Sequence, residues 1–198
     1  MELCNIRDIE RLLKKHGFRF SKSMGQNFLV DPDVPDQIAW GAGIDGAFGV
    51  LEIGPGIGAL TGALSRRASK VLSVELDQRL LPLLEETMAD NQNVKIISGD
   101  ILKLDIVTTV KTEMPDLRYA VCANLPYNIT TPVLTALIEA KIFETITVMV
   151  QREVAQRMCA APGTADYGAF TVYVKYHSEP EILFDVPPSS FIPQPKVT

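Results

Sequence analysis

A glycine-rich segment contains the first residues whose types and spacing could do chemistry. It reads Leu-Glu-Ile-Gly-Pro-Gly-Ile-Gly over residues 51–58 and follows an apolar run. Glycines let a ligand approach the backbone, and the free N–H groups at the start of a following helix can bind its polar groups. The spacing Gly54-x-Gly56-x-x-Ala59 also satisfies the dinucleotide-binding pattern loosely. The segment therefore predicts a cofactor site without deciding which cofactor.

Acidic residues stand at the ends of three successive predicted strands. Glu52 precedes the glycine turn, where a carboxylate disfavours an anionic pyrophosphate but tolerates an ammonium group or an ordered water. Glu75 lies about twenty residues beyond the turn, where an acid accepts hydrogen bonds from both ribose hydroxyls. Asp100 is suited to accept a bond from an adenine amino group. Each acid alone would be an ordinary turn residue. Together they indicate a nucleoside cofactor, and Glu52 with Pro55 favours S-adenosylmethionine over NAD, although both carry a ribose.

The sequence Asn-Leu-Pro-Tyr over residues 124–127 separates these cofactors, because a dehydrogenase has no need for it. The lone pair of an adenine N6 amine is delocalised into the ring, so the amine attacks poorly until it begins to pyramidalise. The side-chain oxygen of Asn124 and the carbonyl of Leu125, which Pro126 turns inward, can accept the two N6–H bonds and favour that change. Tyr127 offers a ring on which an extruded base can stack. In isolation the motif could also be a simple turn.

Alternating strands and helices must position these residues. The sequence predicts an amphipathic helix over 5–16, a second helix opened by Asp31-Pro32, and strands over 48–53, 70–75, 94–97, 119–123 and 145–150. Further helices are predicted over 59–67, 78–89, 132–140 and 152–161. This alternation is typical of an α/β fold with a doubly wound, mostly parallel sheet that binds ligands beyond the carboxyl ends of its strands. Residues 170–176 and 181–186 are predicted to form a C-terminal antiparallel hairpin.

Length and composition fit one well-buried domain. The chain has 198 residues, of which 46% are hydrophobic, and no apolar run approaches the roughly 20 residues that span a bilayer. Three scattered cysteines and two isolated histidines lead us to expect no disulfide and no metal site. The first residues lack a secretory signal pattern, so we expect a cytoplasmic protein.

The net charge of −5 weighs mildly against binding a polyanion, although local basic clusters could still contact phosphates. Solvated surface is the alternative for each cluster. The clusters comprise Lys14, Lys15, Arg19 and Lys22, then Arg66, Arg67 and Lys70, and finally Arg152 and Arg157.

These motifs together resemble the KsgA/RsmA-type ribosomal RNA adenine dimethyltransferases over essentially the whole chain. The resemblance also includes the segments 23–29, 151–155, 167–168 and 191–197. It implies a class I, Rossmann-like methyltransferase that uses S-adenosylmethionine to convert two adjacent adenosines near the 3′ end of small-subunit rRNA to N6,N6-dimethyladenosine. The implied partners are this rRNA and the small ribosomal particle. We expect a monomer without membrane association.

The resemblance implies a role for each cofactor-binding residue. Asn27 and Leu29 would line the methionine end of the cofactor, and Gly54 would lie beneath it. Glu75 would hold the ribose and Asp100 the adenine. The expected cofactor-binding residues are Asn27, Leu29, Glu52, Gly54, Gly56, Glu75, Leu76, Asp100, Ile101 and Asn124.

The target base has its own expected residues. The resemblance places the base between Tyr127 and Phe191, with its amine at Asn124. The expected catalytic residues are Asn124, Leu125, Pro126, Tyr127 and Phe191.

Two segments are expected: an N-terminal helix with a substrate and cofactor loop over 1–30, and the catalytic domain over 31–198. The family's small helical RNA-binding domain, which follows the Phe-x-Pro-x-Pro motif, is expected to be absent. An Erm-type enzyme acting on large-subunit RNA is one alternative, against which the acidic balance and the wording of 24–27 and 124–127 weigh. A mitochondrial transcription factor on the same fold is another, and the intact Asn124 and Tyr127 speak against it. The glycine turn alone would also permit an NAD-dependent oxidoreductase.

Overall fold

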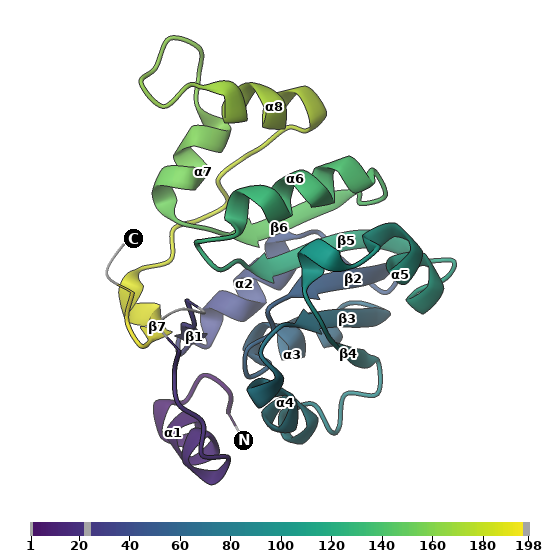
Figure 1. The fold of residues 1–198 in the computed structure, drawn as a ribbon, viewed down its shortest axis with the longest axis vertical. Helices are drawn as coiled ribbons and strands as arrows, with labels where there is room; N and C mark the ends of the chain where they lie inside the picture. The colour runs from purple at the N-terminus through teal and green to yellow at the C-terminus, as the bar shows by residue number, and fades with distance from the viewer. Residues whose placement is uncertain (1, 22–24, 196–198) are drawn as a thin grey trace.

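A computed structural model describes residues 2–21 and 25–195 of the chain (Figure 1). Parts of the motifs noted above lie outside the described residues. These are Lys22, Ser23, Met24, Lys196 and Val197.

A five-stranded parallel sheet forms the centre of the molecule, as the sequence predicts. Its strands are β2 (Phe48–Ile53), β3 (Lys70–Glu75), β4 (Val94–Ser98), β5 (Arg118–Asn124) and β6 (Thr145–Met149), in the spatial order β4-β3-β2-β5-β6. The chain runs outward from β2 to β4 and then crosses back to β5. The strand order therefore reverses between β2 and β5, and a crevice for ligands is expected at the carboxyl ends of these two strands.

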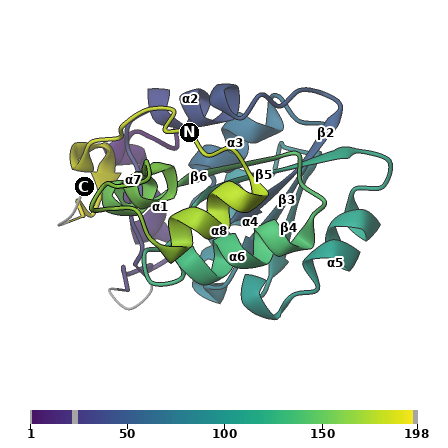
Figure 2. The same cartoon turned by 90° about the horizontal axis from the view of Figure 1, so that it is seen from above.

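Helices cover both faces of the sheet (Figure 2). On one face lie α2 (Asp33–Gly41) and α3 (Ala59–Ser65), and on the other lie α5 (Ile106–Glu113) and α6 (Thr130–Ala140). Every residue of β2 is buried, and alternate side chains enter separate cores. Val50 packs with α2 and α3, whereas Leu51 packs with α5 and α6. Burial on both faces explains why the central strands read as continuous apolar runs.

A third apolar cluster joins α1 (Ile6–Lys15) to α4 (Leu81–Thr87), which follows the 3-10 turn Gln78–Leu80. As predicted, Asn5 caps α1 by accepting a hydrogen bond from the N–H of Arg7 at 3.0 Å. The second helix begins slightly later than predicted, at Asp33, because Pro32 occupies its N-cap position.

The predicted C-terminal hairpin is wrong. The predicted helix α7 (Arg152–Cys159) is present, but residues 170–176 belong to a further helix, α8 (Ala169–His177). Residues 178–186 run extended without a ladder partner in the described part of the chain. Aromatic and β-branched residues gave this segment a strand-like composition, but tertiary contacts decide its structure. Thr171 and Val174 are buried at helical spacing, and the Thr171 hydroxyl donates a 2.6 Å bond to the Arg157 carbonyl on α7.

A small antiparallel sheet, which the sequence did not predict, joins the two ends of the chain. It pairs β1 (Phe28–Leu29) with β7 (Phe191–Ile192), which follows the 3-10 turn Pro188–Ser190. Leu29 lies opposite Phe191 in this pair. Below the left end of the sheet in Figure 1, β1 and β7 therefore bring the N-terminal loop and the Phe-x-Pro-x-Pro segment to one place.

Candidate active site

The glycine turn follows β2 and leads into α3, as predicted. Gly54 and Gly56 adopt φ values of 68° and 62°, a left-handed conformation that strains other residues. A Cβ atom at position 56 would also lie 3.2 Å from the ring of Phe28 on β1. Both positions therefore require glycine, because the turn is left-handed and β1 packs directly against it.

Glu75, at the end of β3, is bound to this turn. One of its carboxylate oxygens accepts a 3.3 Å bond from the Gly56 N–H, and the other accepts a 2.8 Å bond from the Asp77 N–H. The residue is 6% exposed, and burial raises its pKa above the ordinary value of 4.5, while the backbone bonds act in the opposite direction. The Glu75 carboxylate is thus held at the end of its strand, next to the glycine turn.

Asp77 is a site residue to which the sequence reasoning gave no role. It is 5% exposed, accepts a 2.6 Å bond from the Gln26 side chain and pairs with Arg79 at 2.6 Å. The Arg79 bonds lower the pKa of Asp77 most strongly. Arg79 also lies over the Phe18 ring at 5.2 Å. The N-terminal loop is therefore tied to the end of β3. Sequence gave only a weak signal for this, an acid two residues beyond the strand.

Asp100 stands beside Glu75 at the next strand end. The Gly99 N–H donates to the Glu75 carbonyl at 2.9 Å, so β3 and β4 stay paired up to this point. One Asp100 oxygen caps the 3-10 turn Ile101–Lys103 through the Leu102 N–H at 3.0 Å. Of the expected neighbours, Leu76 is exposed, whereas the Ile101 side chain is buried in the core. Leu102, which the sequence reasoning did not name, is 43% exposed and presents an apolar side chain at this edge.

Glu52 lies inside the protein, with 1% of its surface exposed. One carboxylate oxygen accepts hydrogen bonds from Thr61 on α3 at 2.7 Å and from Ser73 on β3 at 2.6 Å. The other oxygen is buried and has no hydrogen-bond partner among the described residues. Burial, the largest influence, raises the Glu52 pKa from 4.5 to about 7, against the effect of the two hydroxyl bonds.

The Asn-Leu-Pro-Tyr motif leaves the sheet at the end of β5. The Leu125 N–H still donates to the Met149 carbonyl of β6 at 3.1 Å, and the Leu125 side chain is buried in the core. The Pro126 carbonyl accepts a 3.1 Å bond from the Thr130 hydroxyl at the start of α6. Asn124 and Tyr127 are both partly exposed between these anchored residues. The core therefore fixes the motif while these two side chains stay accessible.

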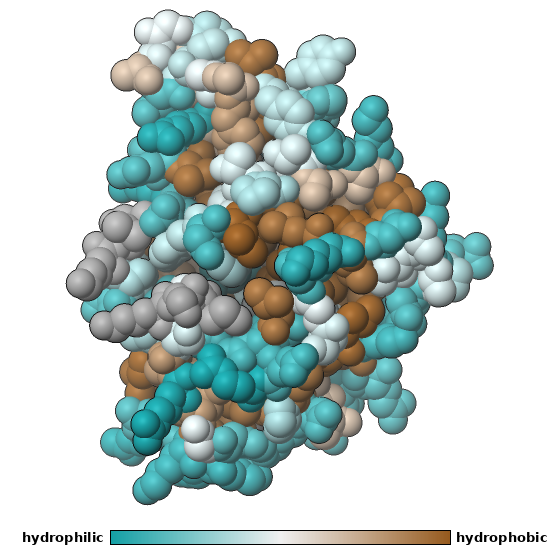
Figure 3. Space-filling view, in the orientation of Figure 1, coloured by the Kyte–Doolittle hydropathy of each residue, from teal (hydrophilic) through white to brown (hydrophobic). Residues whose placement is uncertain are grey.

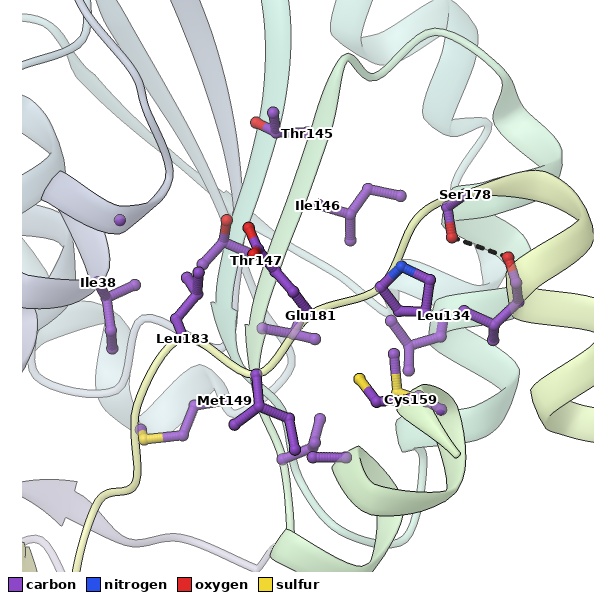
Figure 4. Close-up of a pocket in the computed structure, with 18 of the residues that line it drawn as sticks. Ile38, Leu134, Thr145, Ile146, Thr147, Met149, Cys159, Ser178, Glu181 and Leu183 are labelled. Carbon is purple, nitrogen blue, oxygen red and sulfur yellow. Dashed lines mark hydrogen bonds between the residues drawn. The ribbon is translucent and has the colours of Figure 1, made fainter. Parts of the chain in front are cut away.

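Two cavities meet at Asn124. The smaller, of about 30 Å³, is lined by Asn124 with Asn27, Phe28, Leu29, Glu52, Gly54, Pro55, Gly56, Ile57, Ala59 and Leu60. The larger, of about 830 Å³, lies between β6 and the extended segment 178–186, and Asn124, Tyr127 and Phe191 also line it. Figure 4 labels some of the residues that line it, among them Thr145, Ile146, Thr147 and Met149 of β6 and Glu181 and Leu183 of the segment 178–186.

The larger cavity belongs to an apolar area of the surface. In Figure 3, hydrophobic residues gather over β6 and α6, below α7 and α8. Exposed Ile182 and Leu183 contribute to the wall of this cavity.

The structure thus places the predicted residues in three groups. The smaller cavity gathers Asn27, Leu29, Glu52, Gly54, Gly56 and Asn124. Glu75, Leu76 and Asp100 stand at the neighbouring strand ends and line neither cavity. Tyr127 and Phe191, 64 positions apart in the sequence, line the larger cavity with Asn124. No cluster of three potential metal ligands occurs within residues 2–21 and 25–195, and none of the helices there is long and apolar enough to cross a membrane.

The strand order, the glycine turn at the switch point and the acids at the following strand ends define a class I methyltransferase fold. A family model described as ribosomal RNA adenine dimethylase matches residues 17–198, and the chain belongs to this family of S-adenosylmethionine-dependent methyltransferases. The resemblance is thereby confirmed, and so is the fold class inferred from sequence, apart from its C-terminal hairpin.

Named relatives agree with this assignment. The chain is 47% identical over 189 residues to ribosomal RNA small subunit methyltransferase A of Alkaliphilus oremlandii. This match covers 95% of this chain and 66% of that protein. It is 47% identical over 199 residues to the protein of that name from Streptococcus thermophilus, covering 100% and 69%. The chain therefore spans about two thirds of the length of these relatives.

Two solved structures are also similar. A dimethyladenosine transferase from Plasmodium falciparum is 32% identical with a TM-score of 0.75, and the match covers 85% of this chain and 59% of that one. The 23S rRNA methyltransferase ErmE is 30% identical with a TM-score of 0.69, covering 86% and 66%.

Proposed function

We propose that this chain transfers methyl groups from S-adenosylmethionine to the N6 amine of adenosines in small-subunit rRNA, giving N6,N6-dimethyladenosine. The observation that carries the proposal is the position of Asn124 on the boundary of both cavities. One cavity holds the residues expected at the methionine end of the cofactor. The other holds the two aromatic residues expected to enclose a base.

The residues of the smaller cavity fit the cofactor. Glu52 supplies a buried carboxylate oxygen that lacks a donor among the described residues, and the cofactor carries an ammonium group that can donate. Glu75 and Asp100 supply acceptors for ribose hydroxyls and an adenine amine further along the edge. The bound cofactor would supply an electrophilic methyl group, so no strong general base is needed.

Asn124, Tyr127 and Phe191 have proposed roles in holding the target. The Asn124 side-chain oxygen accepts an N6–H bond and favours the pyramidal amine, and the Leu125 carbonyl accepts the second. Tyr127 and Phe191 bind the faces of a base that has left its stack. Burial raises the pKa of Tyr127, which keeps its hydroxyl neutral at physiological pH.

The small-subunit substrate is supported over the large-subunit alternative by degree of similarity. Relatives named for the small subunit are 47% identical to the chain, whereas the 23S rRNA methyltransferase is 30% identical. We infer that the partner is the small ribosomal particle and that the protein is a cytoplasmic monomer. We also infer that a helical RNA-gripping domain lies in the third of the relatives' length that this chain does not match. This chain should then bind small ribosomal particles more weakly than a full-length relative does, and its affinity should depend less steeply on salt concentration. Such a result would support the assignment of the RNA-gripping domain to that third.

Parallel assays test the proposal. Calorimetric titration with S-adenosylmethionine and with NAD should show binding of the former alone. Methyl incorporation should then be measured on unmethylated small-subunit and large-subunit particles. Incorporation confined to large-subunit RNA would favour the Erm-type alternative, and binding of NAD instead would contradict the cofactor assignment.

A further inference from the structure

Glu52 carries a buried carboxyl group that has no cationic partner in the part of the chain that the structure describes. It lies near the end of β2, and among the described residues only the hydroxyls of Thr61 on α3 and Ser73 on β3 donate hydrogen bonds to it. Both hydroxyls bond the same oxygen, so the second oxygen is left without a donor among residues 2–21 and 25–195. A buried acceptor without a donor is costly, and a buried charge without a counter-charge is more so.

Within residues 2–21 and 25–195, no cation near Glu52 offsets its charge. Its register neighbours are Ser73 on β3 and Cys122 on β5. The ionisable groups near it are Glu75, whose charge raises the pKa of Glu52, and the Cys122 thiol, whose pKa is raised by burial and by Glu52. The glycine turn 54–58, α3 and β1 carry no ionisable side chain. The site therefore has a place for one positive charge that the described residues do not supply.

The smaller cavity provides that place. Glu52 lines it together with Gly54, Asn27 and Asn124, and its volume of about 30 Å³ leaves room for a small polar group. We propose that Glu52 is a proton switch for cofactor binding. Its carboxyl group is protonated in the free protein and releases that proton to solvent when the α-ammonium group of S-adenosylmethionine enters the cavity as its counter-ion.

This inference rests on the proposed function, and it adds a regulated step to it. The proton balance is simple: a neutral carboxyl group becomes a carboxylate paired with an ammonium group that keeps its own charge, and one proton leaves. Burial raises the pKa of free Glu52 to about 7, and a cation beside it would lower that pKa. The bound state therefore holds fewer protons than the free state below pH 7. Affinity must rise as pH increases toward 7, and it must fall again above about pH 8, where the α-ammonium group of the ligand loses its proton.

Calorimetry in two buffers of different ionisation enthalpy measures the released protons directly. At pH 6, where an α-ammonium group is fully charged, S-adenosylmethionine should release close to one proton. Its affinity should rise about tenfold between pH 5.5 and 6.5, because one proton is linked to binding. Methylthioadenosine has the ribose and adenine but lacks the ammonium group. It should release about one proton fewer, which separates Glu52 from Glu75 at the ribose.

A Glu52→Gln variant should bind with an affinity that is nearly independent of pH and without this proton. Glu85→Gln is the matched control, because Glu85 is an exposed glutamate on α4 and should leave the linkage unchanged. Equal proton release with S-adenosylmethionine and methylthioadenosine would overturn the switch, and so would normal release by Glu52→Gln. Should Glu52→Gln fail to fold, the comparison of the two ligands on the unaltered protein decides alone. If neither S-adenosylmethionine nor methylthioadenosine bound to the protein, the proposed function itself would be overturned.

Discussion

The two sides of the candidate active site are built differently. The cofactor side is formed by adjacent strand ends of β2, β3 and β4, and its acids are bonded to backbone groups and side chains of the same edge. The base side combines the end of β5 with Phe191, which the two-residue pairing of β7 with β1 and the neighbouring bonds of Ser190 to Val30 and Asp31 hold near it. Its aromatic residues are partly exposed around a much larger cavity. The difference indicates a preformed site for a small constant ligand and a more open one for an RNA base.

Asn124 joins the two sides, so its removal should have the largest effect. Asn124→Ala should slow methyl transfer by roughly 100-fold or more, because loss of one positioned transition-state partner typically costs that much. Cofactor affinity should change far less. Single-turnover rates at saturating RNA, with calorimetry on the same variant, check both. An unchanged rate would remove Asn124 from the chemistry, and an equal loss in binding would make it a cofactor residue only.

Glu75→Ala should affect the cofactor side alone. The loss of a charged acceptor is expected to weaken S-adenosylmethionine binding by about 1.5 to 3 kcal/mol, or roughly 10- to 150-fold. Part of this loss would come from the Gly56 and Asp77 N–H groups, which lose their partner. Calorimetry measures the change, with Glu85→Ala as a control on the exposed face of α4. Wild-type affinity in Glu75→Ala would contradict the ribose assignment.

Tyr127→Ala and Phe191→Ala should affect the base side alone. Stacking of an aromatic side chain on a base contributes about 1 to 3 kcal/mol, so each variant should lose roughly 5- to 150-fold in kcat/KM for RNA while cofactor binding holds. Trp40→Ala is a suitable control, because Trp40 is an exposed aromatic residue that lines neither cavity. If both variants matched the control, the target base would have to bind elsewhere.

Leu102→Ala should have the smallest effect. Leu102 is exposed beside Asp100, and a bound adenine ring would cover part of its side chain. Partial burial of a few methyl and methylene groups contributes less than about 1 kcal/mol, so affinity for the cofactor should fall less than about fivefold. Titration with S-adenosylmethionine would measure this change. A loss as large as that of Glu75→Ala would mean that apolar packing, and not the carboxylate, dominates recognition at this edge.

The cofactor side was largely predictable from sequence, because its residues follow long apolar strands and one glycine turn. Parallel strands end at the same edge, so Glu52, Glu75 and Asp100 could be placed together without coordinates. The burial of Glu52 against Thr61 and Ser73 was not predictable, since it depends on which way α3 packs.

The base side was harder to predict, for physical reasons. A two-residue strand such as β1 or β7 has no periodicity, and its partner lies some 160 positions away in the chain. Helix α8 was mistaken for a strand because its β-branched and aromatic residues favour strands locally, while its buried Thr171 and Val174 stabilise a helix against α7. Helix α5 lacked a strong amphipathic pattern and was not predicted. The pairing of Phe191 with this site came from the family resemblance alone.

The chemical identity of the transferred product tests the central claim most directly. The protein, in excess over unmethylated small-subunit particles, should be incubated with S-adenosylmethionine that carries a deuterated methyl group, and the rRNA should be digested to nucleosides for mass spectrometry. The account predicts N6,N6-dimethyladenosine with two labelled methyl groups in the wild-type reaction and its near absence with Asn124→Ala. Label on another nucleoside or on another atom of adenosine, or equal labelling by Asn124→Ala, would contradict it.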